Sequence, residues 1–490
     1  MRITKSPVVG VLLGLSFVAA CRSSSNNNNN NNTNPDGPPG PGSDTGPAMI
    51  HIQDVQSDTM VPGTPVELHG VIVTAIDTFG TKTGDLWVEE PGGGAFSGVH
   101  VFGTPVSQAA NLSVGDIVDI TGAIKSEFAL TGATGDTSGR TVTEVQAPKG
   151  GTMTVTKTGK GVVPAPQVID AAAIDAMAPG ARDAEYEKWE GVLVQVTNVR
   201  AQSYPQGFGS KPYPDDAYKV GVTGTLLIES TQTKLANVDG LTCFASITGV
   251  EDYFFDWLLL PRSAADVVTG TNCAPVTITP STVPAIQAAL PTGVVELDNV
   301  TVTGVSNGRT SFWVSASPTA ATTEGGYVFQ SSTTLVLDAA VVPGVQVNVI
   351  GTVSEFNDDT MGGTLTEVQP LRISVVNATP GAPVPITGVS VATLVNPAIA
   401  PLYESVLVTL DNVNISALGA TANGFIATAA QNGTTFGIGT DIVHLAATDL
   451  ACYKTVTGFW TNLEVATGST KPNAYGFIVR DLGTKDGICN

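Results

Sequence analysis

Short segments in which apolar and polar residues alternate recur along the whole chain. A period of two is typical of strands that bury one face. The first five such segments are residues 66–75 (VELHGVIVTA), 85–89 (DLWVE), 98–102 (GVHVF), 117–122 (IVDITG) and 141–146 (TVTEVQ). With turn residues between them and one longer connection before the last, they predict a small Greek-key barrel of five short strands.

Two kinds of segment occur twice, in the order A-B-A-B. The A segment is GDIVDITGAIKSEF followed by TVTEVQ, and its copy is GVQVNVIGTVSEF (344–356) followed by TLTEVQ (364–369). The B segment is WEGVLVQVTNV (189–199), and its copy is YESVLVTLDNV (403–413). An internal repeat of this length indicates repeated structural units. The order A-B-A-B predicts that a unit of two modules was duplicated as a whole.

The two A copies match element by element, since residues 312–314 (FWV) correspond to 86–88 (LWV) and 327–329 (YVF) to 100–102 (HVF). In the first B module, residues 170–177 predict a short helix. We therefore expect an all-β chain of four tandem small barrels. The predicted boundaries are 48–157 for module A1, 158–275 for B1, 276–378 for A2 and 379–490 for B2.

Composition supports strands and argues against nucleic acid. Only 13% of residues are charged, and 54 glycines and 31 prolines provide many turns. The net charge is −21, and loss of Arg2 and Lys5 with the leader makes it −23. Phosphate backbones are bound by clustered Lys and Arg, and the chain has no basic run. We expect nucleic acid to be an unlikely partner and the acidity to keep the protein soluble.

The first 20 residues predict a secretory signal, with a basic start and an apolar stretch from residue 8 to 20 that is too short to span a membrane. The sequence Val18-Ala19-Ala20-Cys21 resembles a bacterial lipobox, which implies lipidation of Cys21; ordinary cleavage after Ala20 is the alternative. Because Arg22 replaces the aspartate associated with inner-membrane retention, we expect an outer-membrane lipoprotein of the cell envelope, held to the membrane by its lipid anchor. Residues 21–47, with seven consecutive asparagines and a Pro/Gly run, predict a disordered tether.

The four remaining cysteines occupy equivalent places in the two B modules. In an oxidising compartment we expect disulfides Cys243–Cys273 and Cys452–Cys489. Zinc is the alternative, but it usually requires close ligand pairs, and neither a CxxC motif nor a neighbouring histidine is present.

The A segments resemble the OB-type modules of secreted bacterial nucleases of the endonuclease/exonuclease/phosphatase type. The matching A residues are 70–72, 86–89, 98–102, 114–122 and 127–128. The B segments are similar to the "yEg" opening that follows such modules, carried by residues 189–191 and 403–405. The resemblance implies four OB-like barrels without the catalytic domain of those enzymes.

Catalysis and metal binding have no sequence support. The four histidines (51, 69, 100 and 444) form no metal-ligating pair, and no nucleophile or nucleotide motif occurs. We expect a protein that is not an enzyme and has no cofactor. Calcium is a weaker possibility at the loop clusters Gly135-Asp136, Asp215-Asp216 and Asn357-Asp358-Asp359, which turn chemistry explains equally well.

Aromatic residues are the candidate ligand contacts. Trp87 and Trp313 fall near the face of strands two and three, where OB-type barrels bind ligands, and could either stack on a ligand or fill the barrel. The run 253–257 predicts the best contact surface, through Tyr253, Phe255 and Trp257.

Three functions are compatible with these features. The first is binding of a glycan, another extracellular polymer or a protein partner by duplicated weak sites. The second is a purely structural surface lipoprotein that acts as a spacer. The third is an accessory subunit of an extracellular nuclease.

Overall fold

The computed structural model describes residues 50–77, 84–129, 139–207, 218–235, 237–329, 337–357, 364–419, 427–439, 441–462, 475–485 and 489. All contacts reported below lie within one compact unit, Met49–Asn490. The predicted signal, Cys21 and the predicted tether lie outside the described residues. Among the residues that are described, no helix is long and apolar enough to cross a membrane.

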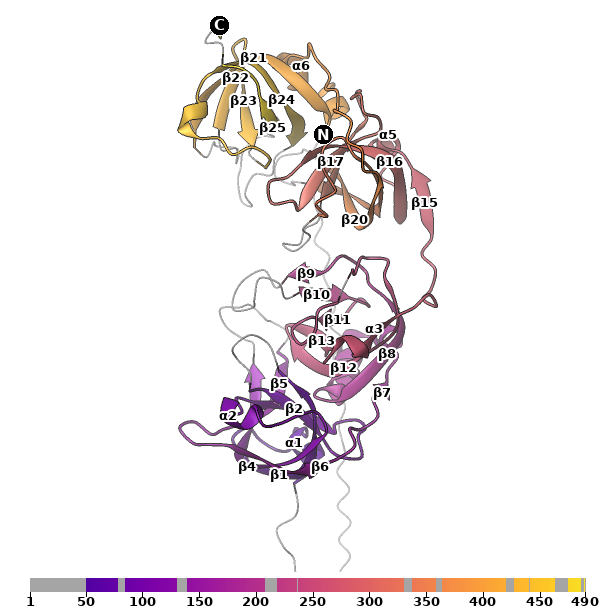
Figure 1. Cartoon of the computed structure of the whole chain (residues 1–490), viewed down its shortest axis with the longest axis vertical. Coiled ribbons are helices and arrows are strands. Elements are labelled where there is room, and N and C mark those ends of the chain that lie inside the picture. The colour runs from indigo at the N-terminus through magenta and orange to yellow at the C-terminus, as the bar shows by residue number, and fades with distance from the viewer. Residues whose placement is uncertain are drawn as a thin grey trace, which may run out of the picture. The chain divides into compact units, whose positions relative to one another are not determined.

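Module A1 is a barrel in which strand one pairs with both strand two and strand four (Figure 1). The strand order is β1-β2-β3-β5-β4, β1 closes onto β4, and β6 adds to the outer edge of β4. Strands β3 and β5 run parallel, with Val101 opposite Val145. The elements are α1 (Ile52–Val55), β1 (Pro65–Ile76), β2 (Leu86–Glu89), β3 (Gly98–Phe102), α2 (Val106–Ala109), β4 (Asp116–Ala129), β5 (Thr141–Gln146) and β6 (Thr154–Lys160).

Module A2 repeats this topology. Its order is β16-β17-β18-β20-β19, β16 closes onto β19, and β18 runs parallel to β20. A short strand, β15, pairs in parallel with β16. The elements are β15 (Ile278–Ser281), α5 (Val283–Ala289), β16 (Val294–Val305), β17 (Ser311–Ser315), β18 (Gly325–Phe329), β19 (Gln346–Asn357) and β20 (Thr364–Asn377).

Module B2 is a closed barrel of order β21-β22-β23-β25-β24, again with strands three and five parallel. Short helices precede its first strand and its fourth. The elements are α6 (Val391–Leu394), η3 (Ala400–Tyr403), β21 (Leu407–Leu418), β22 (Ala427–Gln431), β23 (Thr434–Gly439), η4 (Ala447–Asp449), β24 (Cys452–Asn462) and β25 (Tyr475–Leu482).

Module B1 has the order β7-β8-β12-β13-β11-β10-β9, and β14 pairs with β12. Its strand neighbours match those of the other modules, except that its described residues show no pairing between β8 and β10, the equivalents of strands one and two. Strands β11 and β13 run parallel, as strands three and five do in the other modules. The elements are β7 (Gln167–Val168), α3 (Ala171–Asp175), α4 (Pro179–Tyr186), η1 (Glu187–Trp189), β8 (Leu193–Arg200), β9 (Gln206–Gly207), β10 (Tyr218–Gly221), β11 (Leu226–Glu229), β12 (Cys243–Phe254), β13 (Asp256–Leu260), η2 (Ala264–Asp266) and β14 (Val267–Thr269).

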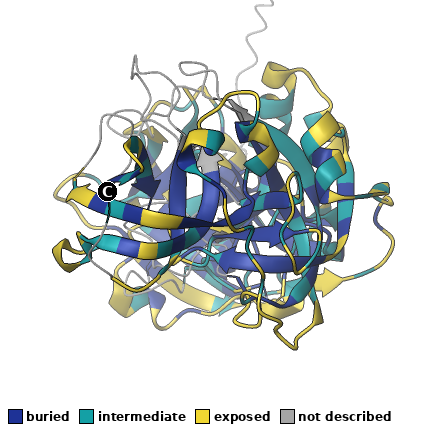
Figure 2. Ribbon diagram, turned by 90° about the horizontal axis from the view of Figure 1, so that it is seen from above, coloured by how far each residue is buried: buried dark blue, intermediate teal, exposed yellow. Residues whose placement is uncertain are grey.

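The prediction of an all-β chain of four tandem OB-like barrels is confirmed. Each barrel has its own apolar core, built mainly from Val, Leu and Ile on alternate strand positions. In Figure 2 the buried segments lie within the strands, and the exposed segments are largely loops and outer faces. Two smaller buried clusters, around Trp87 and around Trp313, lie apart from the barrel cores.

The strand predictions hold best where both ends are marked by turn residues. Segments 98–102 and 141–146 match β3 and β5. The predicted strand 117–122 is instead the first half of the longer β4, because β4 continues to Ala129 in antiparallel pairing with β5. The sequence analysis missed β6 (TVTKTGK), which is mostly exposed and carries no clear apolar alternation. The predicted helix at 170–177 is α3, where the Asp170 carboxylate caps the Ala173 N–H.

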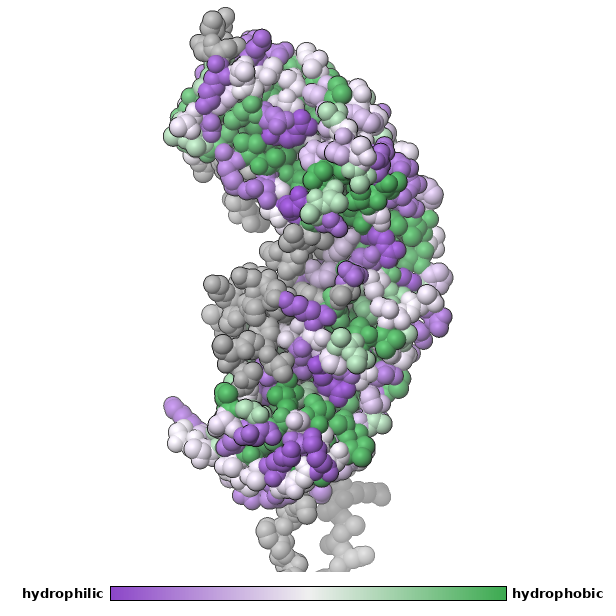
Figure 3. Space-filling view, viewed as in Figure 1, coloured by the Kyte–Doolittle hydropathy of each residue, from purple (hydrophilic) through white to green (hydrophobic). Residues whose placement is uncertain are grey.

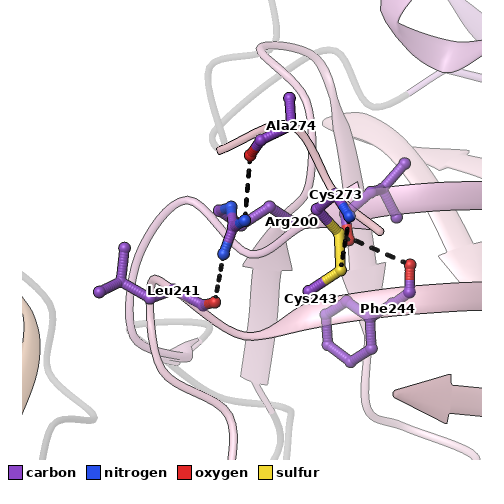
Figure 4. Close-up of a disulfide and its surroundings, with 7 residues drawn as sticks. Arg200, Leu241, Cys243, Phe244, Cys273 and Ala274 are labelled. Carbon is purple, nitrogen blue, oxygen red and sulfur yellow. Dashed lines mark hydrogen bonds between the residues drawn. A yellow bond between two sulfur atoms is a disulfide. The ribbon is translucent and has the colours of Figure 1, made fainter. Parts of the chain in front are cut away.

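The structure contains the two disulfides that the cysteine positions predict, Cys243–Cys273 and Cys452–Cys489. Figure 4 shows the first of them at the start of β12. Nearby, the Arg200 guanidinium donates to the carbonyl groups of Leu241 and Ala274, at 2.6 and 3.0 Å. The disulfide and this arginine therefore tie the end of B1 back to its first and fourth strands.

We predict that non-reducing peptide mapping of the intact protein will find only these two pairs among the four B-module cysteines. Loss of the first bridge in Cys243→Ser/Cys273→Ser should lower the free energy of unfolding by about 3 kcal/mol, because it closes a long loop. The double variant Cys452→Ser/Cys489→Ser is the matched comparison. A Cys243–Cys452 linkage would contradict the pairing.

Candidate functional site at the joint between paired barrels

The outer face of strands two and three is the surface on which OB-type barrels bind ligands. In A1 this face carries Trp87 on β2 and His100 on β3, because Val88 and Val99 point into the barrel core. The Trp87 indole N–H donates to the Asp252 carboxylate of B1 at 2.9 Å. The Trp87 ring also stacks on His100, with centroids 4.7 Å apart. Module B1 therefore contacts A1 on its potential ligand face.

Module B2 contacts the equivalent face of A2. Trp313 on β17 stacks on Phe459 of β24, with centroids 4.8 Å apart and ring planes 9° from parallel. Tyr327 on β18 packs against Trp313 at 5.1 Å. Leu407 and Ile478 of B2 complete this buried cluster. Both A–B pairs are thus joined through the same strands of the A barrel.

A glutamate side chain from the B module fixes each joint. The Glu190 carboxyl group accepts a hydrogen bond from the backbone N–H of Thr143 at 2.7 Å. The Glu404 carboxyl group accepts the equivalent bond from Thr366 at 2.9 Å. Both glutamates belong to the repeated opening of the B modules, and both threonines to the repeated last strand predicted for the A modules. Residues at the joint are therefore among those that repeat in the sequence.

The main chains of the two modules touch at one point in each joint. Gly98 at the start of β3 lies against Gly191, and Gly325 at the start of β18 lies against Ser405. A Cβ on Gly98 or Gly325 would overlap the carbonyl group of that partner. Ser405 adopts a left-handed backbone with φ of 57°, which is unfavourable for a residue other than glycine. Its N–H is held by the Trp460 carbonyl at 2.8 Å.

One glutamine side chain closes each joint from the A side. Gln56, directly after α1, donates to the carbonyl groups of Gly98 at 2.7 Å and Glu190 at 3.2 Å. Gln287 in α5 donates to the carbonyl of Gly325 at 2.9 Å and also forms a hydrogen bond with the Glu404 carboxyl group of B2. The sequence analysis missed both glutamines, because a single glutamine upstream of the repeated segments carries no periodic signal.

Buried acids distinguish the A1–B1 joint from the A2–B2 joint. Burial raises the pKa of Asp252 to about 6. Burial, with a further contribution from the charges of Asp252 and Asp85, raises the pKa of Glu144 to about 8. Between these acids lies His100, whose Nδ1 is 3.8 Å from Glu144 and 3.9 Å from Asp252. Burial lowers the pKa of His100 to about 4, so the imidazole is neutral at pH 7.

Four of the five predicted ligand-contact residues are buried. Trp87 and Trp313, 5% and 3% exposed, fill the joints, whereas Tyr253 and Trp257, both 1% exposed, lie in the B1 core. Tyr253 and Trp257 face each other across the β12–β13 hairpin with ring centroids 5.1 Å apart. Phe255 is half-buried, at the hairpin turn with φ of 63°. The aromatic run of B1 thus packs a core instead of forming the contact surface that the sequence suggested.

No metal centre is formed by the side chains that the structure describes, since no three His, Cys, Asp or Glu residues lie in a suitable group. The predicted calcium-loop residues Asp136, Asp215, Asp216, Asp358 and Asp359, together with Gly135, lie outside the described residues, and of Asn357 only the backbone is described.

An open groove of about 520 Å³ lies beside the A1–B1 joint. Its charged side chains are Arg262 and Asp266, which pair with each other at 2.7 Å. The remaining lining residues are Val114, Val163, Pro164, Ala165, Pro166, Leu193 and Ser263. Because the two charges neutralise each other, the groove is essentially apolar and offers no charged group to fix a ligand.

No protein-family description matches the chain, and no curated protein matches its sequence. Among solved structures, the chain is similar to a replication protein A heterotrimer bound to single-stranded DNA, at 9% identity. That match covers 64% of this chain and 94% of the other, with a TM-score of 0.20. The OB-like assignment rests on the strand order given above.

We predict that Gly98→Ala lowers the free energy of unfolding by about 2 kcal/mol, because overpacking against the Gly191 backbone forces the two barrels apart. Urea unfolding followed by tryptophan fluorescence measures the change. Gly92→Ala is the control, since it lies in the connection that leads into β3 and its added Cβ would have no atom within 4 Å. Equal losses in the two variants would argue against the close contact.

We predict that Trp313 and Phe459 are energetically coupled. Each single change to alanine should cost about 3–5 kcal/mol, and a double-mutant cycle should give a coupling of about 1 kcal/mol from the stacked rings. Phe436 is the control partner, because it packs against Phe477 in the B2 core and not against Trp313. A Trp313–Phe436 coupling as large as the Trp313–Phe459 coupling would contradict a specific joint.

Proposed function

We propose that the chain is a non-catalytic lipoprotein of the cell envelope that acts as a scaffold, with paired barrels as its structural unit. The observation that carries this proposal is the position of the joints. In both pairs, the face that an OB-type barrel offers to ligands is packed against the following barrel. The tryptophans that would stack on a polymer stack instead on His100 and Phe459.

The predicted location agrees with this function. Two disulfides are stable in an oxidising compartment outside the cytoplasm. A lipid on Cys21 would hold the barrels to the membrane, and we infer the outer membrane as the destination. Hydrophobic and hydrophilic residues are interspersed on the face shown in Figure 3, as is usual for a surface exposed to water.

A scaffold role is better supported than binding of a glycan or of nucleic acid. A net charge of −21 repels phosphate backbones, and the described joints contain buried acids in place of basic residues. From the resemblance in sequence we infer that the barrels are related to accessory modules of secreted nucleases, used here as structural units. A protein partner would then attach to the outer surfaces of the pairs.

We predict that Cys21→Ser moves the protein from the membrane fraction to the soluble fraction of a bacterial host. The acyl chains on Cys21 are the proposed membrane anchor, and without acyl chains the protein would bind the membrane only weakly and reversibly. Fractionation with detergent extraction measures the change, and Cys452→Ser, which keeps Cys21, is the control. A Cys21→Ser protein that stays in the membrane fraction would contradict the anchor.

We predict that the soluble Cys21→Ser protein binds neither single-stranded DNA nor polysaccharide. Fluorescence anisotropy with a labelled oligonucleotide and with a labelled glucan, from about 20 to 200 mM salt, tests this, because electrostatic binding of nucleic acid is strongest at low salt. Saturable binding of either polymer at about 150 mM salt would contradict the scaffold proposal and favour a ligand-binding function.

A further inference from the structure

Five carboxyl groups are buried where A1 meets B1. We call them the acidic joint, and their exposed fractions run from 0 to 7%. Two come from strands of A1 and three from B1, so the cluster exists only when the two barrels are together. The members are Glu89 on β2, Glu144 on β5, Glu190 before β8, and Glu251 and Asp252 on β12.

These carboxyl groups are poorly compensated. Among the described residues, neither oxygen of Glu251 has a hydrogen-bond partner, and Oε2 of Glu190 has none. The two side chains belong to neighbouring backbone segments, since Glu190 and Glu251 form a parallel β-bridge. Glu89 accepts from the Leu193 N–H, and Asp252 accepts from the Trp87 indole and the Tyr253 N–H. A buried carboxylate without a cation costs several kcal/mol.

The basic side chains nearby are engaged by other acids. Arg262 is paired with Asp266, Lys125 with Glu127, and Arg140 with Asp183. His100 is neutral at pH 7 and supplies no positive charge. The charge of Arg262 still lowers the pKa of Glu89. The charges of three acids outside the cluster, Asp85, Glu127 and Glu187, raise the pKa of Glu144, Glu190 or Glu251. Members of the cluster in turn raise the pKa of Tyr186 and Glu229.

The A2–B2 joint provides the contrast within the same chain. At the positions equivalent to Glu89, Glu251 and Asp252 it has Ser315, Trp460 and Thr461. Tyr327 replaces His100, and the Trp313–Phe459 stack fills the space. Glu404 and Glu367, the equivalents of Glu190 and Glu144, are retained and buried, and burial raises the pKa of Glu404 to about 7. Of the five acidic positions, three have therefore become uncharged residues.

We propose that the A1–B1 joint is a pH-dependent coupling, which holds the two barrels together while its buried carboxyl groups are protonated and loosens when they ionise. The A2–B2 joint, built on stacked aromatic rings with fewer buried acids, loosens less over the same range. One A–B pair thus responds more strongly than the other to the acidity of the compartment. This inference rests on the geometry of the joint and does not depend on the scaffold function.

Proton binding determines the direction in which the stability of the joint changes with pH. Unfolded Asp and Glu side chains have pKa values of about 4, and burial raises the pKa to about 6 in Asp252, about 7 in Glu89 and about 8 in Glu144. Burial also raises the pKa of Glu190 and of Glu251 well above the usual range, and the charges of acidic neighbours add to the rise. The five carboxyl groups therefore bind more protons in the folded joint than in the unfolded chain. Their contribution to stability is fully present below about pH 4 and is lost as the pH rises through about 6 to 8. His100, whose pKa burial lowers to about 4, acts in the opposite sense below about pH 6.5, but it is one group against five.

Hydrogen exchange of the intact protein tests the coupling. Protection factors, corrected for the intrinsic rate at each pH, are compared at about pH 5.5 and 8.5 for segment 141–146 in A1 and for segment 364–369 in A2. We expect protection of the A1 segment to fall by about tenfold or more, because ionisation favours opening of the joint. The A2 segment should change by less than about threefold. Equal changes in both segments would overturn the proposal.

Variants separate ionisation from general instability. Glu251→Gln/Asp252→Asn keeps the shapes of both side chains, and the amide oxygen at 252 can still accept from Trp87, although the acceptor for the Tyr253 N–H is lost. Because Glu89, Glu144 and Glu190 still ionise, the fall in protection of the A1 segment between pH 5.5 and 8.5 should become smaller and not disappear. Glu404→Gln in the other joint is the matched control and should leave the pH response of A1 unchanged. A full pH response in the Glu251→Gln/Asp252→Asn protein, with its disulfides and circular dichroism intact, would also overturn the proposal.

Discussion

The hydrogen bond from a B-module glutamate to the last repeated strand of an A module organises both halves of this molecule. Glu190 and Glu404 each reach across to a backbone N–H, of Thr143 and Thr366 respectively. The bond can form because a glycine next to the joint lets the two main chains touch. Each OB-like barrel has its own core, but the face left apolar and aromatic on strands two and three needs a cover. The following module provides that cover, and the A–B pair becomes the unit that is stable as a whole.

This dependence explains why the sequence repeats in pairs. A Gly98 or Gly325 side chain would overlap the partner backbone, and an altered glutamate would leave a buried N–H without its acceptor, which is costly. Duplicating a single barrel would expose the Trp87 face, whereas duplicating an A–B pair copies a face together with its cover. The two pairs are therefore constrained at the joint backbone and free to differ in the side chains around it.

Much of the fold could be predicted from the sequence, whereas the joint could not. The sequence indicated β3 and β5 because each carries two buried valines (Val99 and Val101, Val142 and Val145) and is bounded by turn residues. It missed β6, which is mostly exposed and pairs with β4 alone. The aromatic run at 253–257 looked like a surface because adjacent strand residues face opposite sides. The turn at Phe255 reverses the chain, so Tyr253 and Trp257 share the inner side of one hairpin. Contacts such as Trp87 with Asp252 join residues 165 positions apart, and no local pattern records them.

The divergence of the two joints is informative because their backbones agree. Replacing a buried ionic or acidic cluster by well-packed apolar residues is often neutral or stabilising, and the A2–B2 joint shows such a replacement, with Phe459 and Trp460 where A1–B1 has Val250 and Glu251. The same chain could therefore have used the apolar solution twice. Retaining five buried carboxyl groups in one joint lowers its stability at neutral pH and makes that stability depend on protons. The cost is consistent with a joint whose strength changes with the pH of its surroundings, while the aromatic joint changes less.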